Sequence, residues 1–174
     1  LPYPCRILYF PQNANSAYAA RYLRDEYDRM RTLIAGIAGR PIGDDDLRRS
    51  IGIFNENRAL LRALYALKRD RPWLVSADEA YVLTAIAGLV PREEHNELLR
   101  AVLPLLEARA APSRDKIRVV LEGGFCEQPP LDLIRAIARS CYVVDDDLLI
   151  GLGWLTEDVP DGDDPLMMLA ESYL

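Results

Sequence analysis

The sequence contains few of the residues on which catalytic centres and extracellular frameworks most often depend. Its 174 residues include three cysteines and one histidine. An odd number of irregularly spaced cysteines does not suit a disulfide framework and favours a reducing compartment, so we expect a cytoplasmic protein. A single histidine with no nucleophile at a suitable spacing argues against a serine-type catalytic triad within this chain. No apolar run is long enough to cross a bilayer, and we expect no membrane partner.

Several other signatures are absent. The sequence has no P-loop, no complete dinucleotide-binding fingerprint, no Gly-x-Ser-x-Gly elbow and no paired CxxC motif. Basic residues form no block, because 21 Lys and Arg are scattered among 27 Asp and Glu, and the net charge is -6. Since nucleic acid attracts concentrated positive charge, we expect no nucleic-acid partner. Hydrophobic residues make up 50% of the chain, which suffices for one good core or two small ones.

Turn residues and changes of periodicity predict three segments. Residues 1–15 are expected to hold a terminal strand, at residues 6–10, and a polar loop. Residues 16–110 are expected to form a helical section, and residues 115–174 an α/β half-domain. The predicted fold class is therefore α/β, with a helical section followed by a partial doubly wound parallel sheet. Because the chain opens without a methionine, we expect it to be a piece of a longer protein.

Capping residues divide the helical section into four helices. They are expected at residues 17–38, from a cap at Asp44 or Asp46 to about residue 69, at residues 77–88, and from residue 91 onward. Ser16 is a plausible N-cap of the first helix. Its predicted apolar face comprises Ala19, Leu23, Met30, Leu33, Ile34 and Ile37. A capping box, Ser76-Ala77-Asp78-Glu79, predicts the start of the third helix. Pro104 is expected to bend or end the fourth.

Three polar residues are expected among the apolar rows of these helices. Asn57 and Arg58 lie on the second helix, which is apolar on two sides and therefore packs between neighbours. We favour a satisfied polar pair that braces the helices, and contact with a ligand or partner is the alternative. A buried guanidinium needs a carboxylate or carbonyl groups in either case. His95, on the apolar face of the fourth helix, is more simply a hydrogen-bonded core residue than a ligand.

A strand, a helix and a second strand follow one another in residues 116–151. An aliphatic run stops at Gly123-Gly124, Pro129-Pro130 suits the first turn of a helix, and a second apolar run at residues 142–144 stops at three aspartates. So short a connection predicts a parallel βαβ unit. Sites in such sheets form outside the carboxyl ends of the strands. The glycine loop and the aspartates are therefore expected at one edge, and Cys141 at the opposite edge.

Cys126, in the glycine loop, is the strongest single candidate for chemistry. It precedes a proline-started helix whose N-terminus favours a thiolate. A loop thiolate suits nucleophilic catalysis or ligation of a soft metal, and an unremarkable thiol is the alternative. An iron–sulfur cluster needs several thiolates, which one edge of this chain does not supply, so further ligands would come from elsewhere in the protein.

The triple aspartate, Asp145, Asp146 and Asp147, allows two interpretations. Carboxylates at a strand end could bind Mg²⁺, as in phospho-acceptor domains. They could equally cap the next helix and accept hydrogen bonds from backbone amides of the neighbouring loop. We favour the structural interpretation.

Four stretches occur in a distinctive order: Asn55-Glu56-Asn57-Arg58, residues 91–99 (PREEHNELL), residues 124–130 (GFCEQPP) and residues 142–147 (YVVDDD). In this set the chain resembles the 2-hydroxyacyl-CoA dehydratase and benzoyl-CoA reductase family of anaerobic iron–sulfur enzymes. The CEQPP loop, the run CYVVDDDLLIG and Trp154 resemble a benzoyl-CoA reductase core subunit more than a dehydratase subunit. A dehydratase subunit is the first alternative, and a non-catalytic interaction module of helices and half an α/β domain is the second.

The resemblance implies a core subunit in which three cysteines from different parts of the chain hold a 4Fe-4S cluster. Cys126 matches one of them, whereas Cys5 and Cys141 match neither of the others. The resemblance also implies places near the cluster or substrate for Glu127, His95 and the three aspartates, Asp145, Asp146 and Asp147, and it leaves the catalytic residue unknown.

The implied partners are an acyl-CoA thioester as substrate, a paired core subunit and an ATP-hydrolysing iron–sulfur activator that delivers electrons. The implied enzyme is an oxidoreductase. The 174-residue piece alone is expected to bind no cluster and to be inactive.

Overall fold

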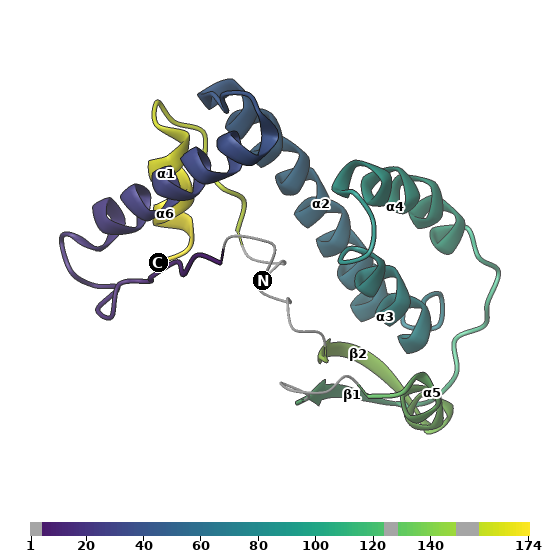
Figure 1. Ribbon diagram of the computed structural model, residues 1–174. Coiled ribbons are helices and arrows are strands. Elements are labelled where there is room, and N and C mark those ends of the chain that lie inside the picture. Colours follow the sequence, from purple (N-terminus) through teal and green to yellow (C-terminus); the bar gives the residue numbers. More distant parts are fainter. Residues whose placement is uncertain (1–4, 124–128, 149–156) are drawn as a thin grey trace. The chain divides into compact units, whose positions relative to one another are not determined.

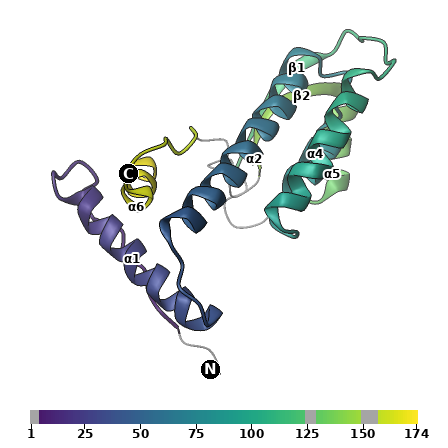
Figure 2. The ribbon, with the colours of Figure 1, turned by 90° about the horizontal axis from the view of Figure 1, so that it is seen from above.

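The computed structural model describes residues 5–123, 129–148 and 157–174 (Figures 1 and 2). In chain order these residues form α1 (Ala19–Ala38), α2 (Asp44–Asp70), α3 (Ala77–Ile86), α4 (Arg92–Glu107), β1 (Ile117–Glu122), α5 (Leu131–Ser140), β2 (Cys141–Asp147) and α6 (Pro165–Ser172). The predicted α/β class, with a helical section before the sheet, is confirmed. The chain divides into two compact units: unit 1 comprises Leu1–Gly52 and Glu157–Leu174, and unit 2 comprises Ile53–Thr156. The three segments inferred from the sequence stay a prediction.

Unit 1 contains α1 packed against α6, which lie side by side in Figure 1 although they stand at opposite ends of the sequence. The buried residues on these two helices include Ala19, Leu23, Leu166 and Ala170. Asp164 is the N-cap of α6, where its Oδ1 accepts hydrogen bonds from the amides of Leu166 and Met167. Its Oδ2 accepts a hydrogen bond from Arg24 Nε at 3.0 Å. One carboxylate therefore both starts α6 and ties it to α1.

The strand predicted at residues 6–10, as part of a sheet whose other strands lie outside this piece, is not formed among the described residues. These residues carry no strand pairing, and the Tyr9 amide instead lies 3.5 Å from Glu26 Oε2. A strand needs a neighbour to pair with, and the described residues of unit 1 offer none.

The first helix differs from its prediction in two ways: it begins later, and part of its predicted apolar face is exposed. It begins at Ala19, two residues after the predicted start, and Ser16 Oγ accepts a hydrogen bond from the Tyr18 amide at 3.3 Å in the turn before the helix. The C-terminal half of its apolar face is exposed, and Ile37 is 70% exposed. The reason is length: α6 has 8 residues and cannot cover the 20 residues of α1.

The larger core of unit 2 lies among α2, α3 and α4. Its buried members are Leu61, Leu64, Leu67, Leu74, Val75, Ala80, Leu99 and Leu106. Each fully buried leucine contributes about 1.5–3 kcal/mol to folding. α2 begins at Asp44, the earlier of the two predicted cap positions, and ends at Asp70, one residue beyond the predicted end. Asn57 and Arg58 are buried among its apolar rows as expected.

The helix boundaries in unit 2 follow the predicted signals. Ser76 Oγ accepts from the Glu79 amide at 3.3 Å while the Ser76 amide donates to Glu79 Oε2 at 2.9 Å, which confirms the capping box. Pro91, the predicted first residue of the fourth helix, is the N-cap of α4, which begins one residue later at Arg92. This helix continues for three residues past Pro104 and ends at Glu107, within one turn of the predicted break. None of the described helices is long and apolar enough to cross a membrane.

The sheet of unit 2 consists of β1 and β2, which pair in parallel as predicted. The register runs from Ile117 opposite Cys141 to Glu122 opposite Asp147, and β2 holds one extra residue, Val144, between the partners of Val119 and Val120. A second apolar cluster joins the sheet to α5 and α3. Its buried members are Ala77, Ile134, Val143 and Leu148.

One prediction about β2 needs correction. The strand does not stop at Val144 but continues through Asp145, Asp146 and Asp147. Strand pairing uses backbone groups, so acidic side chains do not prevent it, and the middle carboxylate has a buried cation beside it that offsets its desolvation.

Candidate functional site

The carboxyl end of the sheet is the edge at which the sequence places the candidate site. β1 ends at Glu122, directly opposite Asp147 at the end of β2. Gly123 follows with a φ of 123°, a conformation that residues with a Cβ rarely adopt. The aspartates and the start of the glycine loop therefore share one edge, as predicted. Cys126 and Glu127 lie outside the described residues, so the position of the thiol stays a prediction.

Asp146 lies in a buried polar contact between β2 and α2. It is 5% exposed, and its partners Lys68 and Tyr65 are 0% and 5% exposed. Lys68 Nζ pairs with Asp146 Oδ2, and the Tyr65 hydroxyl donates to Asp146 Oδ1 at 3.2 Å. Burial, with the negative charge of Asp146, raises the pKa of Tyr65, which keeps this hydroxyl protonated and able to donate. The three side chains thus join the end of α2 to the strand.

The two flanking aspartates do not converge with Asp146. Asp145 is half-buried, and its Oδ1 accepts a hydrogen bond from the Asp146 amide at 3.0 Å, whereas Asp147 is exposed. Among the residues that the structure describes, no three or more His, Cys, Asp or Glu side chains gather as metal ligands would. The predicted contacts of the aspartates with the next helix and with the Cys126 loop fall outside the described residues.

His95 occupies a second buried polar cluster, formed by α2, α3 and α4. Its Nε2 lies 2.8 Å from the carbonyl oxygen of Leu83, which can only accept, so Nε2 carries the proton. Its Nδ1 then accepts from Asn57 Nδ2 at 2.8 Å, and Asn57 Nδ2 also donates to Asn96 Oδ1 at 2.6 Å. Arg92 completes the cluster by donating to Asn57 Oδ1 at 3.1 Å. The prediction of a hydrogen-bonded core histidine is confirmed.

The protonation of His95 makes the stability of the protein depend on pH. Burial lowers the pKa of His95 below its ordinary value of 6.5, and the nearby Arg92 lowers it further, while the Leu83 carbonyl acts in the opposite direction. As the pH falls below 6.5, His95 binds a proton in the unfolded chain but stays neutral in the folded chain. We therefore expect the free energy of unfolding to fall, by at most about 1.4 kcal/mol per pH unit, until the folded pKa is reached.

A His95→Gln variant provides the comparison for this pH dependence, because glutamine does not titrate. Urea unfolding at pH 7.5 and 5.5 should show the stability of the native protein approaching that of the variant at the lower pH. A difference between the two proteins that stays constant with pH would contradict the buried neutral imidazole.

The structure places His95 and Asp146 in two separate clusters, both attached to α2. Asn57 belongs to the His95 cluster and Lys68 to the Asp146 cluster. The two residues are eleven positions apart on α2, which corresponds to about 16 Å along the helix. Lys68 and Tyr65 are contacts that sequence reasoning does not identify. The signal is nevertheless present, because the apolar row through Leu61 and Tyr65 reaches Lys68 at the next three-residue step.

The two cysteines outside the glycine loop are free thiols. Cys5 is exposed in unit 1. Cys141 opens β2 at the amino end of the sheet, opposite Ile117, and its Sγ donates to the Ile137 carbonyl at 3.1 Å. Within unit 2, the described residues therefore supply no second thiolate at the edge where the glycine loop begins.

Comparisons with known proteins cover the entire chain. Residues 1–174 match the family described as 2-hydroxyglutaryl-CoA dehydratase, D-component. The chain is 39% identical over 165 residues to a subunit of the benzoyl-CoA reductase of Thauera aromatica, an alignment that covers 94% of this chain and 43% of that protein. It is 27% identical over 172 residues to the beta subunit of lactoyl-CoA dehydratase from Anaerotignum propionicum, covering 98% and 46%.

A more distant relative has the same span. The chain is 23% identical over 170 residues to the beta subunit of (R)-2-hydroxyglutaryl-CoA dehydratase from Acidaminococcus fermentans, covering 98% of this chain and 45% of that protein. The chain thus spans somewhat less than half the length of these relatives.

Proposed function

We propose, because this chain belongs to the 2-hydroxyglutaryl-CoA dehydratase, D-component family, that it is part of a core subunit of an enzyme that acts on CoA thioesters. More narrowly, we infer a benzoyl-CoA reductase, an oxidoreductase of the cytoplasm. The observation that carries the narrower inference is the identity of 39% to a benzoyl-CoA reductase subunit, against 27% and 23% to dehydratase subunits over nearly the same residues.

In this proposal Cys126 is one ligand of a 4Fe-4S cluster whose other ligands come from parts of the subunit outside residues 1–174. The bound cluster would supply electrons of low potential for reduction of the acyl group. The parallel register, which puts Asp147 beside the start of the glycine loop, supports this arrangement. Glu127, Asp145 and Asp147 are then polar groups of this chain on the cluster side of the sheet.

Two further residues of the candidate site act at a distance in this proposal. Asp146 is occupied by Lys68 and Tyr65, and His95 is occupied by Asn57 and the Leu83 carbonyl. Neither side chain is free to contact substrate. Their role is to hold β2 and α4 against α2, and so to keep the edge of the sheet in place.

The proposed partners follow from the same relationship. A paired core subunit would complete the substrate site, and an ATP-hydrolysing iron–sulfur activator would deliver the electrons. The chain's part is to present a cluster ligand from a firm βαβ unit and to keep water away from the reacting thioester.

The full-length subunit, assembled anaerobically with its paired subunit and activator, tests the substrate class. With ATP and a strong reductant, we expect consumption of benzoyl-CoA and formation of a non-aromatic diene thioester. Lactoyl-CoA serves as the comparison substrate and should not be dehydrated. Dehydration of lactoyl-CoA without reduction of benzoyl-CoA would instead assign a dehydratase, and inactivity of a cluster-loaded complex on both thioesters would contradict the proposal.

A further inference from the structure

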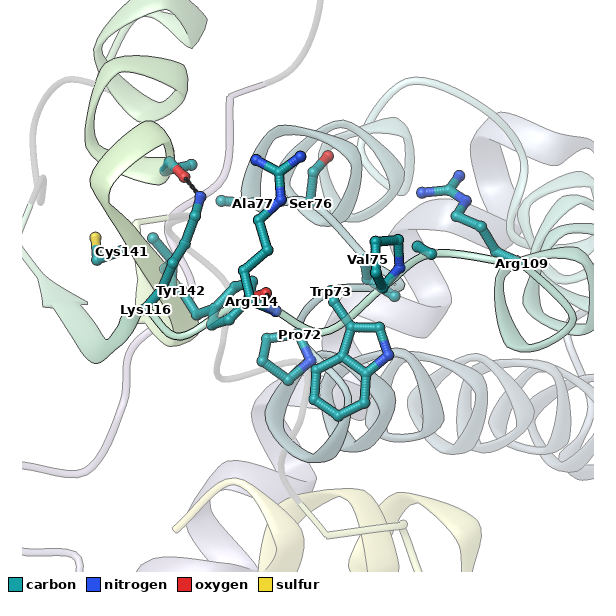
Figure 3. A pocket seen from close by; sticks show the side chains of 14 residues that line it. Pro72, Trp73, Val75, Ser76, Ala77, Arg109, Arg114, Lys116, Cys141 and Tyr142 are labelled. Atoms are coloured by element: carbon teal, nitrogen blue, oxygen red, sulfur yellow. Dashed lines mark hydrogen bonds between the residues drawn. The ribbon is translucent and has the colours of Figure 1, made fainter.

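A pocket of about 260 Å³ opens in unit 2 at the amino end of the sheet (Figure 3). Lys116 directly precedes β1 and Cys141 begins β2, so this is the end opposite Gly123. The pocket therefore lies outside the candidate cluster edge, and none of the functions proposed above uses it. Several of its lining residues belong to the βαβ unit, whose paired strands hold them in place.

The lining combines apolar surface with two aromatic rings. Val75 and Ala77 are buried beneath it at 1% and 6% exposure, and Val143 belongs to the apolar cluster of the sheet. Trp73 and Tyr142 add their rings to the lining, as Figure 3 shows. Such a surface suits a flat ring, because aromatic side chains bind ring systems through their faces and exclude water.

The charge of the pocket is opposite to that of the chain. The chain carries a net charge of -6, yet the described lining residues include Arg109, Arg114 and Lys116 and no carboxylate. Figure 3 shows the side chains of Arg114 and Lys116 extending in the same direction. A local concentration of cations in an acidic chain indicates an anionic ligand.

Arg114 and Lys116 have N–H donors that are available to a ligand. The Arg114 guanidinium has no hydrogen bond or ion pair to any described residue, although the Arg114 amide donates to the Tyr142 hydroxyl at 2.9 Å. Lys116 Nζ gives one hydrogen bond to the Ala138 carbonyl at 2.7 Å and lies 5.4 Å from the Tyr142 ring centroid. An ammonium has three donors, so two remain for a ligand.

The third cation, Arg109, and the two carboxylates nearest to the pocket are already in ion pairs. Arg109 pairs with Glu79 at 2.7 Å, and Asp78 pairs with Arg135 at 2.8 Å. Ser76, which lines the pocket, also donates to both carboxylates, from its hydroxyl to Asp78 and from its amide to Glu79. The positive charge available to a ligand is therefore that of Arg114 and Lys116.

We propose that this pocket binds the nucleotide end of a coenzyme A thioester, with the adenine ring against Trp73 and a phosphate between Arg114 and Lys116. The inference rests on the proposed function for its choice of ligand, since phosphate and a flat ring are the chemistry that the pocket matches. Strands of six and seven residues are about 20 Å long. Coenzyme A carries its nucleotide and its thioester at opposite ends of a long flexible arm, so the two parts can occupy opposite ends of the sheet.

Binding of adenosine 3′,5′-bisphosphate to the full-length subunit, measured by calorimetry without turnover, tests this proposal. An Arg114→Ala variant should bind the bisphosphate at least about tenfold more weakly, because it loses a charge-assisted hydrogen bond. Arg139→Ala is the matched control: it removes the same charge from the exposed last turn of α5 without altering the lining, and its affinity should stay within about twofold of the native protein. Circular dichroism establishes that both variants are folded.

Three results would overturn the proposal. They are unchanged binding in Arg114→Ala, inorganic phosphate binding as tightly as the bisphosphate, and failure of free coenzyme A to displace the bisphosphate. The first result would show that the bisphosphate does not bind in this pocket. The second would show that the pocket binds anions in general, and the third that its ligand is not coenzyme A. Because no catalysis is measured, loss of the proposed reductase activity with intact bisphosphate binding refutes the proposed function and not the pocket.

Discussion

A full-length subunit with Cys126→Ser is expected to be purified anaerobically with most of its iron and sulfide lost and with no reductase activity. A serine hydroxyl is a poor ligand for iron in comparison with a thiolate, and a cluster held by three cysteines has no spare one. The cluster absorbance should fall in parallel with iron and sulfide content. These measurements test the ligand directly and do not depend on knowing the acyl-CoA.

Cys141→Ser is the matched control for this experiment. It makes the same substitution in the same βαβ unit, at the opposite end of the sheet from Gly123. Its thiol donates a single hydrogen bond to the Ile137 carbonyl, which a serine hydroxyl can also make. The control should keep its full complement of iron and sulfide. Undiminished cluster content in Cys126→Ser would refute the assignment of this thiol.

Lys68→Met should lower the free energy of unfolding by about 3–5 kcal/mol, because it leaves the Asp146 carboxylate buried without its cation. Lys68 is 0% exposed and Asp146 is 5% exposed, so water cannot replace the lost partner without opening the contact between α2 and β2. Urea unfolding followed by circular dichroism gives the change. The Tyr65 hydroxyl remains as a donor to Asp146, which keeps the cost from being larger.

The double variant Lys68→Met/Asp146→Leu distinguishes two causes of the lost stability. One is the burial of a carboxylate without a cation, and the other is the loss of an ion pair that itself stabilises the fold. Replacing both members by apolar residues is often neutral, so the double variant should be markedly more stable than Lys68→Met alone. Arg100→Met is the exposed control: its pair with Glu56 has side chains that are 50% and 42% exposed, and its loss should cost less than about 1 kcal/mol. Equal costs in the buried and the exposed variants would contradict the structure.

Much of the fold is predictable from local signals. The capping box at Ser76 and the proline before α4 place two helix starts, and the positive φ of Gly39 agrees with the predicted end of α1. These succeed because caps and turns depend on a few neighbouring residues and on backbone sterics. The parallel βαβ unit also follows from the sequence, since short crossover connections allow few arrangements.

The failures occur where a residue's state depends on a distant partner. An aliphatic run at residues 6–10 looks like a strand, but strand formation needs a neighbour that local composition does not reveal. Ile37 belongs to an apolar helical row and is exposed because α6 does not reach it. A lysine in the last turn of a helix, such as Lys68, ordinarily faces water and complements the helix dipole, so its burial is not expected from position alone.

The sequence alone is sufficient to predict the edge of the sheet at which the glycine loop begins, because that edge follows from chain order in a parallel βαβ unit. Tertiary structure alone decides the state of the aspartates that follow. Asp146 is inside β2 and paired with Lys68, from a helix 78 residues away in sequence, while Asp147 is exposed opposite Glu122. The difference is physical: chain order determines where a loop emerges, whereas the burial of a carboxylate depends on whether packing brings it a cation.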